Sequence, residues 1–290
     1  MKIGITSDCS SGLEYAPFEH HIKITRTTIH FGDEELIDGI DITADEFYNK
    51  LESSTIIPST SAPSPKEIIR CCEEYRREGY TDVIHFPISF GLSAYGENLL
   101  AVADDYVDGI NLHVFNCHTA CIMEGYTAKY AEILANKGYS LEDIYAQCQE
   151  QTDNTKAYFV VDDLKYLVKN GRLGAVSGFI GGLVKIKPIL QLGLNGKIEI
   201  FERVRTHQKA VERMIGVVED DTKDCKSVIY IVQHSNRLED AKALAEQIKG
   251  IYKNIKRVEI ATVTPTVGAH IGSGIISLAY IKTDTLKENL

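Results

Sequence analysis

Residues 82–89 read Asp-Val-Ile-His-Phe-Pro-Ile-Ser, a largely apolar run with the length of one strand. A run that is apolar at nearly every position is typical of a parallel strand with both faces buried. The sequence predicts a helix before this strand, at residues 65–78, and another after it, from about residue 94 to about residue 106. A further strand at residues 112–115 and a helix at residues 119–137 follow. Strands and helices that alternate every ~25–35 residues indicate βαβ units and a parallel sheet.

The chain ahead of this run carries signals for smaller elements. Residues 2–6 alternate as a short strand does, and a small β-hairpin is predicted over residues 22–42. Two hydroxyl–glutamate pairs have the spacing of a capping box and predict the starts of helices: Thr43 with Glu46, and Ser64 with Glu67.

The pattern changes after a strand at residues 156–161. Residues 186–204 indicate a β-hairpin around Asn195-Gly196, a common tight-turn dipeptide. Residues 260–281 hold no Asp, Glu, Lys or Arg, and we interpret them as strand, Gly-rich turn and strand. The sequence therefore predicts an α/β fold with two domains. Residues 1–158 form an α/β domain with the hairpin as an insertion, and residues 159–290 form an α+β domain.

The composition is that of an ordinary globular protein of 290 residues, of which 44% are hydrophobic and 25% charged. The formal net charge of −10 argues against a general binder of nucleic acid or of anionic membranes. Seven cysteines, an odd number scattered along the chain, are typical of reduced thiols, and the N-terminus has no signal-peptide pattern. We therefore expect a cytoplasmic protein.

Four segments carry more hydroxyl, glycine or cationic character than a core loop needs. They are Thr60-Ser61, residues 91–93, residues 170–172 and residues 268–274. Ligands of open α/β sheets lie beyond the carboxyl ends of the strands, and the first two segments flank such strands. Ser93 lies near a predicted helix N-terminus, where its hydroxyl and the local N–H groups can hold an anion.

One hypothesis for these segments is a serine hydrolase. Gly91-Leu92-Ser93 follows an apolar strand and precedes a helix, as in a nucleophile elbow, and His270 and Asp8 could complete a triad. The elbow needs a second glycine two residues after the serine, and Tyr95 stands there instead. A plain helix cap is the simpler interpretation of Ser93.

A metal centre is a second hypothesis. Cys117, His118 and Cys121 could supply three ligands, but a structural zinc site needs a second close pair, which the sequence lacks. The glycines within residues 178–185 do not have the spacing of a phosphate-binding loop. We therefore expect no metal and no cofactor.

The third hypothesis is a binding module without catalysis. Thr60, Ser61 and Ser93 offer neutral donors, and Arg172 and His270 offer cationic ones. Such a set suits a carboxylate or a phosphate. The apolar segments 179–183 and 186–190 follow Arg172, so an amphiphile with an acidic head and a long tail would match, although both segments could equally belong to the core.

Several short motifs, taken in order, resemble the DegV family of bacterial fatty-acid-binding proteins. Thr60-Ser61-Ala62-Pro63-Ser64 resembles the family's T-S-x-P-S signature. The other landmarks are Ser7-Asp8, Asp38-Gly39 with 40–42, Ile88-Ser89, Leu92-Ser93, 161–167, Gly171-Arg172, 186–190 and 270–274. The resemblance covers about residues 2–282.

This resemblance implies two domains with a long-chain fatty acid between them. It implies that the protein presents the fatty acid carboxylate to a separate, ATP-dependent fatty acid kinase subunit and carries no catalytic residue of its own. By position, Thr60 and Ser93 would hold the carboxylate with Ser61 nearby, and Arg172 and His270 would line the head-group end. Transient membrane contact would fit such a role. The runner-up remains a hydrolase of lipid esters that uses Ser93 and His270.

The sequence departs from the family pattern at two places. After Leu92-Ser93 the family usually has Gly-Thr, and here it has Ala94-Tyr95. After the strand at residues 112–115 the family usually has Asp-Ser, and here it has Asn116-Cys117. Tyr95 adds bulk and a hydroxyl close to the expected head-group site.

Overall fold

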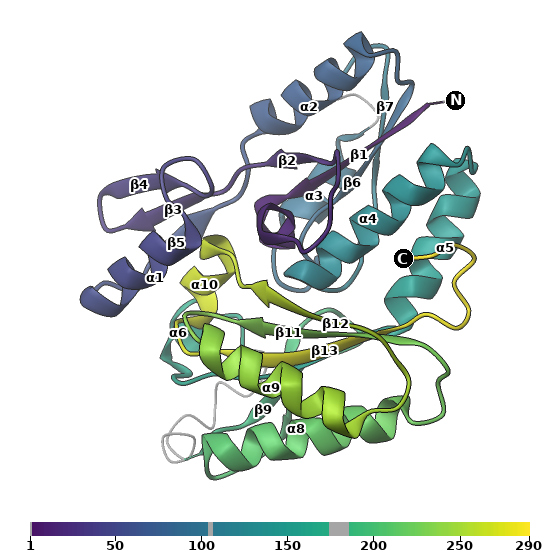
Figure 1. Ribbon diagram of the computed structural model, residues 1–290. Coiled ribbons are helices and arrows are strands. Elements are labelled where there is room, and N and C mark those ends of the chain that lie inside the picture. Colours follow the sequence, from purple (N-terminus) through teal and green to yellow (C-terminus); the bar gives the residue numbers. More distant parts are fainter. Residues whose placement is uncertain (1, 104–106, 174–185) are drawn as a thin grey trace.

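The computed structural model describes residues 2–103, 107–173 and 186–290. The described chain contains a parallel sheet of four strands, a mixed sheet of six strands and an antiparallel sheet of three strands (Figure 1). This arrangement confirms the predicted fold class, which combines a parallel-sheet α/β part with a second part on a separate sheet.

The parallel sheet has the strand order β2-β1-β6-β7. Its strands are β1 (Ile3–Asp8), β2 (Lys23–Thr25), β6 (Asp82–Phe86) and β7 (Asn111–Val114). The helices on its two faces are α2 (Pro65–Arg77) and α3 (Tyr95–Leu100), and α4 (Ile122–Asn136) and α5 (Leu141–Asp153). The apolar run at residues 82–89 forms β6, whose residues are all buried. Val83 packs on the α2 side and Ile84 on the α4 side, because successive strand residues point to opposite faces.

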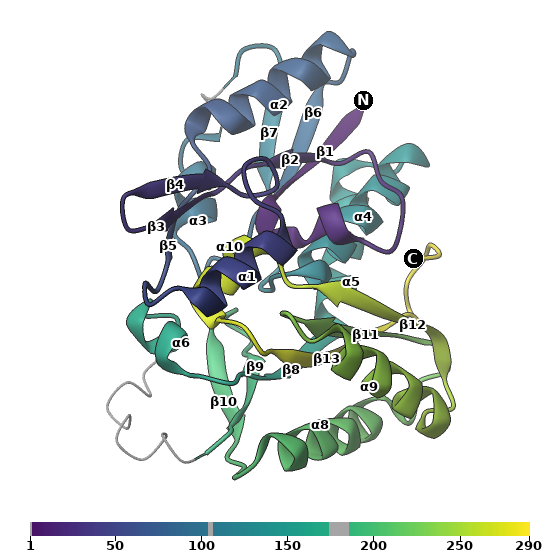
Figure 2. The same cartoon turned by 60° about the vertical axis from the view of Figure 1, so that its left-hand side comes forward.

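The three-stranded sheet projects from the parallel sheet and has the order β4-β3-β5 (Figure 2). Its elements are β3 (Thr28–Phe31), β4 (Glu34–Ile37), β5 (Ser59–Ser61) and the helix α1 (Ala44–Ser53). Two short 3-10 helices follow β1, namely η1 (Cys9–Ser11) and η2 (Leu13–Tyr15). The predicted capping box opens α1, since Thr43 Oγ1 accepts from Glu46 N while Glu46 Oε2 accepts from Thr43 N.

The six-stranded sheet has the order β10-β9-β8-β13-β11-β12 and is antiparallel except for the β11–β12 pair. Its strands are β8 (Thr155–Val160), β9 (Ile189–Leu192), β10 (Ile198–Glu202), β11 (Val228–His234), β12 (Ile255–Thr262) and β13 (Ile276–Lys282). The helices of this part are α6 (Lys165–Lys169), α8 (His207–Thr222), α9 (Leu238–Ile251) and α10 (Pro265–Ile271). The hairpin predicted around Asn195-Gly196 is present as β9 and β10.

One hydrophobic core joins the two large sheets. Helices α4 and α5 lie between them, as Figure 1 shows, and share a cluster with both. Ile84 and Phe86 reach it from the parallel sheet, and Ile229 and Ile281 reach it from the six-stranded sheet. The opposite face of the six-stranded sheet is covered by α8 and α9. The domain division at residue 158 remains a prediction, and β8 spans it.

Three local predictions were wrong. Residues 260–281 do not form strand, turn and strand, because the middle of this segment is the helix α10, which begins at Pro265 after its cap Thr264. Ser64 precedes α2 but makes no side-chain capping bond. Residues 22–31, which the predicted hairpin would use as its first strand, are divided between β2 in the parallel sheet and β3 in the three-stranded sheet.

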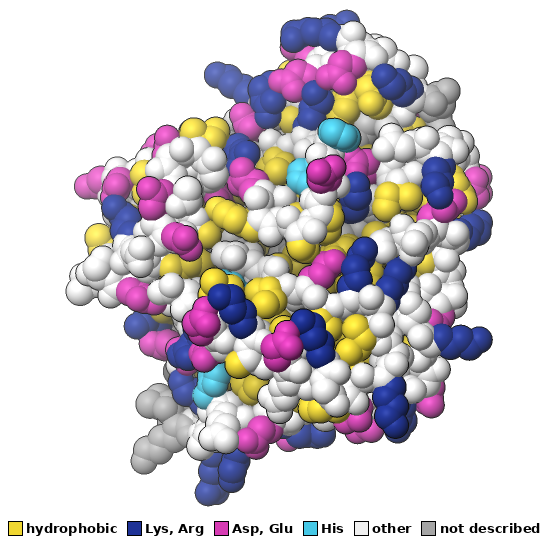
Figure 3. Space-filling view, viewed as in Figure 1, with side chains coloured by type: hydrophobic (Ala, Val, Ile, Leu, Met, Phe, Trp, Pro, Cys, Tyr) yellow, Lys and Arg dark blue, Asp and Glu magenta, His cyan; other side chains and the backbone are white. Residues whose placement is uncertain are grey.

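Three further observations concern the charges on the surface, the length of the helices and the state of the cysteines. Lys and Arg are mixed with Asp and Glu over the face in Figure 3, and hydrophobic side chains show between the two halves of the molecule. No helix in the described part of the chain is long and apolar enough to cross a membrane. All seven cysteines are free thiols.

Candidate functional site

A cavity of about 720 Å³ lies where the carboxyl ends of β1 and β6 face α10. Ligand sites of this size are common, and this is the edge of the sheet where α/β folds bind ligands. Four of the five predicted binding residues line the cavity: Thr60, Ser93, Arg172 and His270. The fifth, Ser61, is not among the lining residues.

Thr60 and His270 form the most direct contact at the site. Thr60 Oγ1 lies 2.7 Å from His270 Nε2, so β5 of the three-stranded sheet meets α10 of the C-terminal part. Burial and, to a smaller extent, the nearby positive charge of Arg172 together lower the pKa of His270 to about 4. The imidazole is therefore neutral at pH 7. Its Nδ1 is buried and has no hydrogen-bond partner among the described residues.

Ser61, the neighbour of Thr60, points elsewhere. Its Oγ lies 2.7 Å from His30 Nε2 on β3, and its side chain is exposed. The difference follows from the strand, because residues next to each other on β5 project to opposite faces. Ser61 therefore belongs to the outer face of the small sheet.

Ser93 ends a tight loop whose backbone is held by Ser89. The N–H groups of Leu92 and Ser93 both donate to Ser89 O, at 2.9 and 3.1 Å. Ser93 Oγ accepts a hydrogen bond from the backbone N of Tyr95, the first residue of α3, at 3.2 Å, although the N-cap position itself is Ala94. The loop is fixed from the C-terminal part as well, since Ser89 Oγ donates to Gly196 O at 2.9 Å.

The tip of the β9–β10 hairpin fits closely against this loop. Gly196 has a φ of +68°, and a Cβ atom on it would overlap Ser89 Oγ and lie 3.2 Å from His118 Cα. Only glycine satisfies both conditions. The hairpin therefore fixes the loop that carries Ser93.

Arg172 links the loop that carries Ser93 to the residue that follows helix α6. Its Nε donates to Leu92 O at 3.2 Å and its Nη1 donates to Asn170 O at 2.5 Å. Among the described residues that line the cavity, Arg172 is the sole Lys or Arg. It is the natural partner there for an anionic group.

The cavity walls away from these donors are apolar. Helices α2 and α3 contribute Ile68 and Leu99, and the C-terminal part contributes Ile198, Val267 and Ile271. The last three also border a smaller pocket of about 60 Å³ whose lining is almost wholly apolar. The site thus has a polar end and apolar sides. Of the apolar segments expected to follow Arg172, residues 179–183 lie outside the described part of the chain.

Two buried carboxyls lie beside the polar end and were not predicted as binding residues. Asp8 lines the cavity and accepts from Ile88 N at 2.9 Å. Ser10 Oγ bridges it to Glu124, 2.9 Å from Glu124 Oε2. Burial raises the pKa of both carboxyls, and the charge of Asp8 raises that of Glu124 further.

The hypothetical triad of Ser93, His270 and Asp8 is not assembled in the structure. His270 Nε2 faces Thr60 rather than Ser93, and Asp8 bonds to Ser10 and Ile88 rather than to His270. Nor do the described residues contain a group of three or more His, Cys, Asp or Glu side chains that could hold a metal ion.

The family comparison covers the whole of this architecture. A model described as an uncharacterised protein of the DegV family matches residues 2–283. The chain belongs to the DegV family. A DegV domain-containing protein of Staphylococcus aureus is 33% identical over 283 residues, which span 97% of this chain and 98% of the relative.

Solved structures of DegV proteins have the same fold. DegV of Bacillus subtilis, described as a fatty acid binding protein, superposes with a TM-score of 0.87 at 29% identity. A fatty acid binding DegV family protein from Streptococcus agalactiae gives 0.86 at 27% identity. Each comparison covers 97% of this chain and 99% of the other.

The two departures from the DegV pattern both lie near the site. Tyr95 lines the cavity and packs edge-on against the buried His85, with ring centroids 5.7 Å apart. Asn116 Oδ1 accepts from His118 N at 3.1 Å and from Phe90 N at 3.4 Å, and so orders the loop that contacts the hairpin tip. The sequence did not predict that Thr27 and Thr266 also line the cavity.

Proposed function

We propose that this protein binds a long-chain fatty acid in the cavity and presents its carboxylate to a separate, ATP-dependent fatty acid kinase subunit. The observation that carries the proposal is one continuous cavity with a polar end and apolar walls. The carboxylate would lie at the polar end, with these residues: Thr60, Ser93, Arg172 and His270. The two DegV relatives described as fatty acid binding support the ligand class.

The energetics suit this ligand. A chain with about fourteen methylene groups gains roughly 11 kcal/mol gross on burial, of which the costs of association remove a large part. The carboxylate needs hydrogen bonds to offset its loss of water, and each bond to a charged group contributes about 1.5–3 kcal/mol. Tail burial therefore supplies affinity, while the polar end fixes the orientation of the acid.

The Thr60–His270 pair gives the carboxylate a directed donor. In the neutral imidazole with the proton on Nε2, His270 donates to Thr60 Oγ1. The hydroxyl of Thr60 is then free to donate its own proton to the carboxylate. Because His270 carries no charge, Arg172 supplies the positive charge of the polar end. We assign this charge to the acyl phosphate and to the docking of the kinase subunit, while the hydroxyl groups hold the carboxylate.

The protein contributes positioning rather than chemistry in this proposal. A carboxylate oxygen attacks the γ-phosphorus of ATP held by the kinase, and ADP leaves, so the binding protein needs no nucleophile of its own. Loading from a membrane would be transient. Leu100 and Val102 are 52% and 45% exposed at the end of α3, and Val102 also lines the cavity, so this rim could meet lipid.

The proposal is tested by reconstitution. Delipidated protein is incubated with oleate, ATP and Mg²⁺, with and without a bacterial fatty acid kinase subunit, and acyl phosphate is trapped with hydroxylamine. We expect hydroxamate only when both proteins are present. Equal product from the kinase subunit alone would contradict the presenting role, and product from the binding protein alone would contradict the absence of catalysis.

A further inference from the structure

The Asp38-Gly39 motif is not used by the cavity, yet it is deeply buried. Asp38 follows β4 and has no exposed surface. Gly39 has a φ of +74°, and a Cβ atom there would overlap the side chains of Glu14 and Arg26. Arg26 Nη1 also donates to Asp38 O at 3.1 Å. The turn is therefore built so that the Asp38 carboxyl points inward, away from water.

The Asp38 carboxyl reaches a residue 228 positions away in the chain. Its Oδ2 accepts from Thr266 N at 2.9 Å and from Thr266 Oγ1 at 2.6 Å. Thr266 lies in the first turn of α10, where a backbone N–H has no partner within the helix. The other oxygen, Oδ1, has no hydrogen-bond partner among the described residues. Both hydrogen bonds that the Asp38 carboxylate makes with described residues therefore go to Thr266 at the start of α10.

Helix α10 is held against the three-stranded sheet at both ends. Asp38 binds it at Thr266, and Thr60 binds it one turn later at His270. Figures 1 and 2 both show α10 beside α1, and a Cβ atom on Gly268 would lie 2.6 Å from Tyr48 Oη. With such close packing, the bond at the first turn sets the rotation of the helix and hence the direction of His270.

We propose that Asp38 is a positioning residue for the head-group site, which fixes α10 so that His270 meets Thr60. The proposal rests on the proposed function only for its consequence in fatty acid binding. It gives the Asp38-Gly39 motif a role at the cavity although Asp38 does not line it.

The surroundings of Asp38 decide how its variants should behave. Burial raises its pKa to about 6, although the two hydrogen bonds from Thr266 lower it; Glu14 raises the pKa and Arg26 lowers it to a smaller extent. The titratable or charged groups that face it are Glu14 and Tyr15 from η2, Cys9 from η1, Arg26 from the segment after β2, and Tyr48 from α1. Removal of the Asp38 charge alone would lower the pKa of a nearby histidine, because an anion favours the imidazolium.

The first experiment therefore follows the His270 imidazole by NMR in the ligand-free protein as pH is varied. In the wild type we expect a pKa near 4. In Asp38→Ala we expect a rise toward 6.5, because a released α10 exposes the ring to water and separates it from Thr60. Asp38→Asn keeps a carbonyl oxygen for Thr266, so it should stay near the wild-type value. An unchanged or lower pKa in Asp38→Ala would overturn the proposal.

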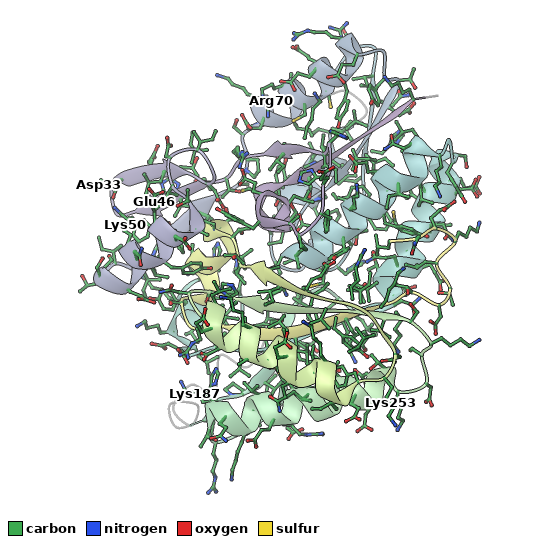
Figure 4. All side chains as sticks on the ribbon, viewed as in Figure 1. Asp33, Glu46, Lys50, Arg70, Lys187 and Lys253 are labelled. Atoms are coloured by element: carbon green, nitrogen blue, oxygen red, sulfur yellow. The ribbon has the colours of Figure 1, made fainter. Side chains whose placement is uncertain are left out.

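A control separates positioning from a general loss of stability. Glu46, labelled in Figure 4, closes the capping box of α1 and has no hydrogen bond to α10. Glu46→Ala should lower the melting temperature but leave the His270 titration unchanged. If Glu46→Ala moves the titration as far as Asp38→Ala does, the effect is one of stability and the proposal fails.

The second experiment is a double-mutant cycle with oleate. We expect Asp38→Ala and His270→Ala each to weaken binding about tenfold or more, and the double variant to bind no more weakly than His270→Ala alone. Losses that multiply would show that Asp38 acts independently of His270 and would overturn the proposal. If the wild type binds no oleate, the proposed function fails, and the ligand-free titration still decides the role of Asp38.

Discussion

Replacement of Thr60 by valine tests the polar end of the cavity at one atom. Valine has nearly the same shape and suits a strand at least as well, so β5 should keep its pairing with β3. The change removes the hydroxyl that lies 2.7 Å from His270 Nε2 and that we assign to the carboxylate. A hydrogen bond to a charged group contributes about 1.5–3 kcal/mol, which corresponds to a roughly 10- to 150-fold weaker Kd.

The chain provides its own control for this substitution. Ser61 stands next to Thr60 on the same strand, but its hydroxyl faces His30. Ser61→Ala should change the Kd less than about twofold, since the expected effect depends on a hydroxyl that faces the cavity. The Kd of oleate is measured by calorimetry on delipidated protein, and thermal unfolding by circular dichroism checks that all variants fold. Equal affinity of Thr60→Val and wild type, or an equal loss in Ser61→Ala, would refute the assignment.

Three further predictions concern charge, close packing and pH. Arg172→Ala should leave oleate bound while acyl phosphate formation with the kinase subunit falls, and unchanged transfer would refute the assigned role. Gly196→Ala should lower the free energy of unfolding in urea by roughly 2–5 kcal/mol, because alanine there adds left-handed strain and overlaps Ser89. The control Gly138→Ala, at a φ of +80° with open space around it, should lower that free energy by only about 1–2 kcal/mol, and equal losses would contradict the close fit of the hairpin tip. Because burial raises the pKa of Asp38 to about 6, the wild type should lose about 2 kcal/mol of unfolding free energy relative to Asp38→Asn as pH rises from 4 to 6, and a constant difference would argue against that pKa.

Elements with local signals could be predicted from the sequence. The apolar run at residues 82–89 gave β6 because a strand buried on both faces needs apolar residues throughout. The Asn195-Gly196 turn gave the β9–β10 hairpin, and the Thr43–Glu46 pair gave the start of α1, because each depends on residues that are close in sequence.

Helix α10 shows why other elements could not be predicted. Six of its seven residues are buried, between α1 and the cavity, so it has no polar face and no helical stripe. The one local signal was Thr264-Pro265, a cap followed by proline at the first helical position, which the uncharged, glycine-rich segment obscured. The sequence therefore predicts a turn at His270, whereas the residue lies on the helix α10.

The candidate site was predicted in its residue types rather than in its geometry. Thr60 and Ser61 carry the same chemistry, and only the pairing of β5 with β3 decides which of them faces the cavity. Asp38 and Thr266 are brought together from 228 positions apart, a contact that no local pattern encodes. The order of the motifs could indicate the ligand class, while the tertiary fold determines which side chains face the cavity.

The most direct test of fatty acid binding is mass spectrometry of the protein as purified from bacterial cells, under native and then denaturing conditions. We predict an added mass equal to one long-chain fatty acid in the native spectrum and its release on denaturation. A spectrum without added mass, unchanged after incubation with oleate and palmitate, would contradict the account and direct attention to Tyr95 at the cavity wall.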